Sequence, residues 1–180
     1  KERNTMNNKH PHFNSINNID DIGSLIDLIE KSKNSYVKDN LSIHLHDRQL
    51  TLLRDIKKHN KPHHKKIRIS KYKKLMENPE TQPEHYELHK KLFLKQYQKL
   101  GSKGLITLDT QPENGLPYDM EFTQKGLDIL DEISKLEKEW EEKVLENVED
   151  KEELLKLLKI VAVNSLDISY EIQKKLRGVY

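Results

Sequence analysis

Two short glycine-containing motifs in the second half of the chain constrain its fold more than any other feature. Residues 100–106 have the sequence LGSKGLI, residues 122–126 have the sequence FTQKG, and Phe122 follows Ile106 by sixteen residues. Glycine commonly ends a helix, and threonine commonly caps the start of one. The predicted order is therefore helix, strand, turn, strand and helix, which is how a β-wing is attached to a helix-turn-helix.

Composition limits the size of the core. The chain has 180 residues, of which 34% are hydrophobic and 34% are charged. So low a hydrophobic fraction predicts a small core for a chain of this length. We therefore expect elongated helices, or a partner chain that helps to bury the apolar side chains. The absence of cysteine excludes disulfides and cysteine-ligated zinc. No apolar run approaches the roughly 20 residues of a membrane span, and no signal-peptide pattern is present, so we expect a cytoplasmic protein without membrane contact.

Charge is distributed unevenly along the chain. Residues 54–103 carry fifteen basic and five acidic side chains, a net charge of +10, whereas residues 104–180 have a net charge of −8. A basic block followed by an acidic tail is typical of a protein with a nucleic-acid contact surface. The alternative is a solvated, lysine-rich surface that binds nothing.

Hydrophobic periodicity and capping residues predict a chain dominated by helices. The expected helix starts include Asp20 or Asp21, Asp47, Thr123 and Asp150, and the expected apolar face of the second helix is Leu50, Leu53 and Ile56. Residues 1–18 are polar and rich in asparagine, which predicts a flexible arm. The expected helices cover residues 20–39, 47–59, 71–76, 83–100, 124–147 and 150–177, and the expected strands cover residues 65–69, 105–108 and 118–122. In the fourth of these helices, Tyr86, Phe93, Tyr97 and Leu100 form one apolar stripe, and Lys91 and Lys95 lie opposite it.

The last helix carries an apolar stripe with no obvious cover within so small a chain. Its apolar residues recur at intervals of three and four, which predicts pairing with the first helix and with a second copy of the chain. The alternative is a helix packed wholly on its own domain. The predicted dimerisation residues are Ile22, Leu25, Ile29, Trp140, Leu154, Leu158, Val161, Ile168 and Ile172.

The order of elements and three segments resemble the MarR family of bacterial and archaeal transcriptional regulators. Residues 47–56 resemble the family's second helix, with Gln49 at its usual polar position. Residues 100–106 resemble the exit of its recognition helix into the wing, and residues 122–130 resemble the exit of the wing into the fifth helix. The resemblance covers about residues 20–177. It implies a mainly α fold, a winged helix-turn-helix with a short β-wing and long N- and C-terminal dimerisation helices.

The predicted domain organisation follows from this order. We expect a single winged-helix domain over residues 19–180, after the flexible arm of residues 1–18. Its DNA-binding core would cover about residues 42–123, and its dimerisation helices would cover about residues 20–39 and 124–177. The resemblance also implies a small-molecule effector, held in a cleft between the dimer base and the winged helix.

The predicted function is sequence-specific binding of double-stranded DNA by a homodimer that regulates transcription. A helix fits the major groove, and a two-fold dimer presents two such helices to half-sites about 34–36 Å apart. The residues expected to contact phosphates are Lys65, Lys66, Arg68, Lys71, Lys73 and Lys74. The candidates for base contacts on the fourth helix are Gln82, His85, Lys91 and Lys95.

Two departures from the family pattern favour other functions. The family's wing usually carries an arginine that enters the minor groove, but residues 109–119 contain no arginine or lysine. An acidic wing would be repelled by phosphate. Residues 78–83 also resemble an insertion before the recognition helix. The alternatives are a degenerate winged helix used for protein interaction or architecture, and a plasmid or phage replication or partition protein.

Neither catalysis nor a cofactor is predicted. The sequence lacks a cysteine nucleophile, a glycine-rich phosphate loop and a Gly-x-Ser-x-Gly elbow, so we expect no enzyme activity. His85 and His89 lie four residues apart, as metal-binding pairs on helices do, but this spacing alone is weakly specific and we predict no metal site. A solvated helix face whose glutamates pair with lysines one helical turn away explains the acidic stretch without chemistry. The glutamates are Glu137, Glu139, Glu141 and Glu142, and the interleaved lysines are Lys135, Lys138 and Lys143.

Overall fold

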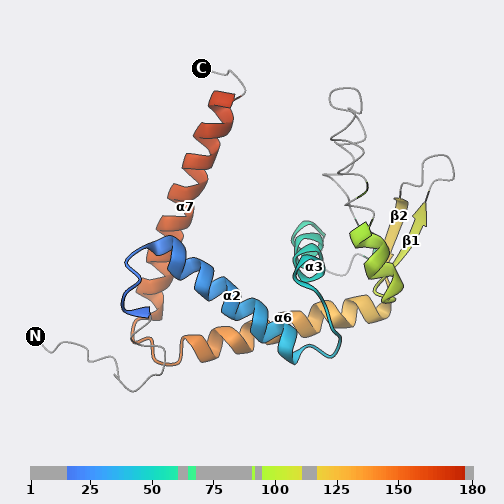
Figure 1. Ribbon diagram of the computed structural model, residues 1–180, viewed down its shortest axis with the longest axis horizontal. Coiled ribbons are helices and arrows are strands. Elements are labelled where there is room, and N and C mark those ends of the chain that lie inside the picture. The colour runs from blue at the N-terminus through green and yellow to red at the C-terminus, as the bar shows by residue number, and fades with distance from the viewer. Residues whose placement is uncertain (1–15, 61–64, 68–90, 92–94, 111–116, 177–180) are drawn as a thin grey trace, which may run out of the picture. The chain divides into compact units, whose positions relative to one another are not determined.

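The computed structural model describes residues 16–60, 65–67, 91, 95–110 and 117–176. The chain divides into two compact units, Lys1–Trp140 and Glu141–Tyr180. The first unit contains helices α2 and α3, strands β1 and β2 and most of helix α6, and the second contains helix α7 (Figure 1). The predicted class, a mainly α winged helix-turn-helix with a short β-wing, is confirmed.

Helix α2 spans Ile22–Asn40 and begins at a side-chain cap. The Oδ1 atom of Asp21 accepts a hydrogen bond from the backbone N–H of Ser24 at 2.7 Å, as the sequence predicted for an aspartate at this position. This hydrogen bond lowers the pKa of the Asp21 carboxyl group. The helix is buried only near its end, at Val37, whereas Ile22 is 61% exposed.

Helix α3 spans Asp47–His59 and packs through the apolar face that the sequence predicted. Leu50, Leu53 and Ile56 are all buried. The buried Gln49 explains why a polar residue occurs among them, because its Oε1 atom accepts a hydrogen bond from the backbone N–H of His46 at 3.1 Å. This bond satisfies a backbone donor at the start of the helix.

The wing is an antiparallel pair of strands, β1 (Ile106–Thr110) and β2 (Pro117–Phe122). Ile106 pairs with Phe122 at its base, and the register shifts between Asp109 and Thr110. The predicted strand at residues 65–69 is present, over its described part, as an isolated bridge between Lys66 and Glu121. Ile67 N–H donates to Met120 O at 2.8 Å, so residues 65–67 pair with β2 as a short third strand would.

A glycine turn links the helical segment 95–102 to β1. Gly104 has a φ of 70°, a left-handed conformation that glycine adopts without strain. Its N–H donates to Gly101 O at 2.8 Å, and Leu105 N–H donates to Leu100 O at 3.1 Å. These two bonds form a Schellman motif, which explains the GSKG pattern of the first sequence motif.

The second motif attaches the wing to helix α6, which spans Gln124–Val144. The Oγ1 atom of Thr123 accepts from Gly126 N–H at 3.0 Å and thereby caps the helix, as predicted. Gly126 packs so closely against the wing base that an added Cβ would lie 2.0 Å from Leu105 O. The helix ends three residues before the predicted end at residue 147, because residues 145–147 form a turn.

One hydrophobic core joins these elements in the first unit. The buried side of α6 supplies Ile129, Leu130 and Ile133, and the helical segment 95–102 supplies Tyr97 and Leu100. The predicted stripe through Tyr97 and Leu100 is thus confirmed, while Tyr86 and Phe93 lie outside the described residues. The second half of α2 lies antiparallel to α6, because Trp140 Nε1 donates to Ser32 Oγ and Ser42 Oγ donates to Glu132 Oε2 (Figure 1).

Helix α7 spans Lys151–Leu176 in the second unit. The Oδ1 atom of Asp150 accepts from Glu153 N–H at 2.8 Å, so Asp150 caps the helix as predicted. Its apolar side chains are largely exposed, with Leu166 at 69% and Ile168 at 63%. Within the described parts of the chain, no helix is both long enough and apolar enough to cross a bilayer.

Candidate nucleic-acid interface

The described lysines of the predicted interface are exposed. Lys65 and Lys66 lie on the segment that forms the bridge to β2, and Lys91 and Lys95 belong to the helical region before β1. The remaining candidates lie outside the described residues: Arg68, Lys71, Lys73, Lys74, Gln82 and His85. Their predicted roles therefore stay predictions.

Backbone pairing fixes Lys65 and Lys66 beside the wing. Phe122 N–H donates to Lys65 O at 2.8 Å, and Lys66 is the bridge partner of Glu121. The position of both lysines thus depends on β2, which is itself anchored by its pairing with β1. Both side chains are exposed, and their backbone is held in place by its pairing with β2.

The helical segment 95–102 has an exposed basic side and a buried side. Lys95 and Lys99 are exposed, whereas Tyr97 and Leu100 are buried. Burial, together with the negative charge of Asp55, raises the pKa of the Tyr97 phenol well above its usual value. The phenol therefore stays protonated and neutral, and the charge of this segment comes from its lysines.

The outer face of the wing is acidic. Asp109 on β1 and Glu121 on β2 are exposed, and the strand register pairs the backbone of Asp109 with that of Asp119. Exposed carboxylates on the wing repel phosphate. The structure thus places the acidic residues noticed in the sequence on the two paired strands, beside the two basic residues of the bridge segment.

Two other lysines of the basic block and wing motif bind backbone carbonyl groups. Lys103 Nζ donates to His44 O at 2.8 Å, and Lys125 Nζ donates to Lys103 O at 2.9 Å. These bonds connect the start of α6, the turn before β1 and the connector before α3. No sequence signal distinguished these lysines from those expected to meet DNA, because their acceptors are 59 and 22 residues away along the chain.

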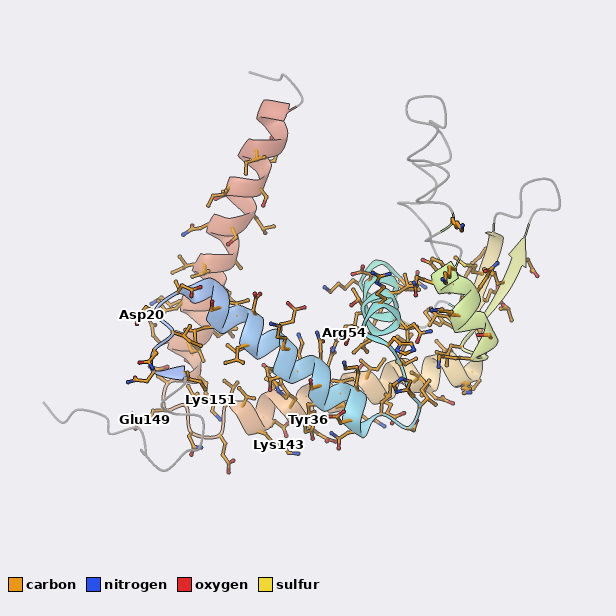
Figure 2. The ribbon with its side chains drawn as sticks, viewed as in Figure 1. Asp20, Tyr36, Arg54, Lys143, Glu149 and Lys151 are labelled. Atoms are coloured by element: carbon orange, nitrogen blue, oxygen red, sulfur yellow. The ribbon has the colours of Figure 1, made fainter. Side chains whose placement is uncertain are left out.

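Arg54 joins three helices through one guanidinium group. Its Nε atom donates to Glu137 Oε1 of α6 at 2.7 Å, and its Nη1 atom donates to Asn34 Oδ1 of α2 (Figure 2). Within the described structure, the buried Nη2 atom has no hydrogen-bond partner. The interpretation of Glu137 as a residue paired with lysines on α6 is wrong, because it is half-buried and its carboxylate pairs with Arg54. Glu139 is exposed and accepts a hydrogen bond from Tyr36 at 3.3 Å.

The predicted dimerisation residues fall in two groups. Ile22, Ile29, Leu158, Ile168 and Ile172 are exposed, and Leu25, Trp140, Leu154 and Val161 are partly buried. Trp140 already has a role within the chain, since it donates to Ser32 at 3.3 Å. The large exposed apolar side chains on α2 and α7 are the features that a partner would cover.

No metal centre is evident in the part of the chain that the structure describes. There, no cluster of three or more histidine or acidic side chains could hold an ion. His85 and His89, the weak candidates from the sequence, lie outside that part. His44 and His46 form an edge-to-face contact with ring centroids 4.9 Å apart.

A capped long helix, a two-stranded wing and a bridge strand beside a basic helical segment together define a winged helix-turn-helix protein. No protein-family model matches the sequence, and no match was found among curated proteins. Solved structures do match. A crystal structure of MarR shares 21% sequence identity and a TM-score of 0.55, over 84% of this chain and 95% of that chain.

Two further structures agree with this match. A MarR transcriptional regulator from Methanosarcina mazei Go1 shares 18% identity and a TM-score of 0.52, over 87% of this chain and 99% of that chain. A multiple antibiotic resistance repressor, MarR, shares 19% identity and a TM-score of 0.52, over 81% and 98% of the two chains. The chain therefore has the MarR-like winged-helix fold.

Proposed function

We propose that this protein binds double-stranded DNA and regulates transcription as a homodimer in the cytoplasm, without enzymatic activity. The observation that carries the proposal is the exposure of four lysines, Lys65 and Lys66 beside the wing and Lys91 and Lys95 in the helical region before it, in a fold shared with MarR proteins. Two of the similar structures are described as a transcriptional regulator and a repressor.

The chemistry of this surface favours contact with phosphates. Exposed ammonium groups release counterions from DNA when they meet its backbone, which makes binding strong at low salt and weak at high salt. The helix before β1 would enter the major groove, and the exposed carboxylates of Asp109 and Glu121 would keep the wing out of the minor groove. A small-molecule effector remains part of the proposal.

The homodimer is supported by the apolar side chains that the chain leaves exposed. Ile26 and Ile29 on α2 and Leu158 and Ile168 on α7 are each more than two-fifths exposed. A monomer that leaves so much apolar surface in water is a candidate for association. Two copies would present two basic surfaces to DNA half-sites about one helical turn apart.

Fluorescence anisotropy with duplex DNA at several salt concentrations tests the proposal. We expect affinity to fall roughly a thousandfold between about 50 and about 200 mM salt. A Lys65→Ala/Lys66→Ala variant should lose affinity, and its salt slope should decrease by about two per subunit. A Lys135→Ala/Lys138→Ala variant is the matched control, because these exposed lysines lie on α6 away from the wing motif.

The control should bind like the unmodified protein. A flat salt dependence, or equal losses in both double variants, would contradict DNA binding through this surface. A degenerate winged helix used for protein interaction is the second candidate, and the exposed carboxylates of Asp109 and Glu121 on the wing are the observation that favours it. That function predicts no measurable affinity for duplex DNA even at low salt.

A further inference from the structure

Helix α3 and the helical segment 95–102 border a hollow of about 360 Å³ that opens to solvent. This volume is at the lower end of the roughly 300–1,000 Å³ typical of small-molecule sites. Asp47, Thr51 and Asp55 lie at intervals of four residues and so line one edge of α3, while Gln96 and Tyr97 come from the other helix. The hollow lies within the winged-helix unit itself.

The charge of the hollow is concentrated at Asp55. This carboxylate is half-buried and acts on the neighbouring buried Tyr97, whose phenol pKa it helps to raise. The carboxylate of Asp47 lies 2.7 Å from Lys38 Nζ, so it already has a cation. Asp55 forms no ion pair with any residue that the structure describes. Arg48 also lines the hollow, and its side chain is exposed to solvent.

We propose that this hollow binds a small organic cation, with its ammonium group beside Asp55 and its apolar body against Leu52 and Tyr97. Pairing with an ammonium group would offset the cost of holding a carboxylate partly out of water. A volume of this size accommodates about one ring and a short chain. A metal ion fits less well, since the described residues offer no set of three ligands.

The site differs from the effector cleft that the family resemblance implies, because it lies between α3 and the helix that leads into the wing. A ligand there would contact both helices and would favour one of their relative positions. This inference goes beyond the proposed DNA binding and does not depend on it. The binding experiments below contain no DNA, so either proposal can fail without the other.

Titration with benzylamine, followed by two-dimensional ¹H–¹⁵N NMR of the full chain, tests the site. Benzylamine is a protonated one-ring amine at neutral pH, and benzyl alcohol and benzoate are its neutral and anionic counterparts. We expect saturable shifts at the amides of Thr51 and Gln96 with benzylamine, and binding about tenfold weaker or less for the other two. Equal responses to all three compounds, or no response to benzylamine, would overturn the proposal.

Two variants test whether the ammonium group of bound benzylamine lies beside Asp55. Asp55→Asn removes the charge but keeps the shape, and benzylamine affinity should fall about tenfold or more. Asp131→Asn is the control, because Asp131 is exposed on α6 and does not line the hollow. Thr51→Lys places an ammonium group at the exposed rim and should block binding even if Asp55→Asn alters folding. Unchanged affinity in Thr51→Lys, or in a folded Asp55→Asn variant, would exclude this site.

Discussion

Gly126 has the least room for a side chain among the described glycines. An added Cβ would lie 2.0 Å from Leu105 O and 2.9 Å from Leu105 C, and both are backbone atoms that cannot move aside. We expect Gly126→Ala to lower the free energy of unfolding by about 1–3 kcal/mol, the usual cost of overpacking. Gly23→Ala in α2 is the control, since its Cβ would meet only Asp21 Oδ1 at 3.4 Å.

Chemical denaturation of both alanine variants measures the difference. The Gly23 variant should be neutral or slightly more stable, because alanine is the better helix former by up to about 1 kcal/mol. Equal stability of the two variants would show that α6 and the wing base do not approach each other as closely as the structure indicates.

The capping carboxyl group of Asp21 should make the stability of the protein depend on pH. Its hydrogen bond from Ser24 lowers the carboxyl pKa below the ordinary 3.8. A carboxyl group with a lowered pKa in the folded state contributes stability above its unfolded pKa, and this stability is lost as the pH falls through the folded pKa. Asp21→Asn keeps a capping oxygen without a charge and should lose less stability between about pH 5 and about pH 2.5.

Thermal unfolding of the two proteins at both pH values checks this expectation. An Asp27→Asn variant, at an exposed position further along α2, serves as the control and should follow the unmodified protein. If Asp21→Asn loses as much stability on acidification as the control, the Asp21 cap does not contribute to the acid response.

Single-residue roles were predictable where they depend on near neighbours. Asp21, Thr123 and Asp150 each cap the next helix through a bond to a residue three positions away, and such bonds follow from residue type and spacing. The partners of Arg54 and Lys103 were not predictable. Their partners are 20 to 83 residues away, and only the folded chain brings them together.

At the scale of elements, Arg54 holds α2, α3 and α6 together. Its side chain is 17% exposed, and that of Glu137 is 32% exposed, so the pair is only partly screened by water. Arg54→Met would leave Glu137 without its cation and Asn34 without its donor. We expect the free energy of unfolding to fall by about 1–3 kcal/mol, less than for a fully buried pair.

A double-mutant cycle measured by denaturant unfolding tests this connection. Adding Glu137→Gln to Arg54→Met removes the unpaired charge and should recover part of the loss. An Arg48→Met variant is the control, because Arg48 is exposed on the same helix. Additive effects of the two changes would show that the guanidinium and carboxylate groups do not interact across α3 and α6.

The order of elements was predictable because each helix carries its own periodic apolar face and its own cap. The expected boundaries agree with α2 and α3 to within two residues, and differ by three at the end of α6. The sequence predicted the candidate interface as a block of basic residues. It could not predict that Lys65 and Lys66 would lie beside strand β2. Their position comes from bonds to Phe122 and Glu121, which are more than fifty residues away.

At the scale of the whole molecule, the described part of the second unit leaves the apolar side chains of α7 largely exposed. Leu155, Leu157, Leu158, Ile160 and Leu166 are all about half-exposed or more. Burying one such side chain contributes about 1.5–3 kcal/mol, so a dimer that covers several of them from each copy would be stable at micromolar concentrations. The domain boundaries predicted from the sequence stay predictions, since they depend on this assembly.

Analytical ultracentrifugation of the full chain tests the assembly directly. The unmodified protein should sediment as a dimer, and Leu158→Ser/Ile168→Ser should sediment as a monomer at micromolar concentrations, because four apolar side chains are lost from a symmetric interface. Asn164→Ser/Asp167→Ser changes two exposed polar positions on the same helix and should remain dimeric. A monomeric unmodified protein would leave a single basic surface per molecule, and the paired reading of two DNA half-sites would then be impossible.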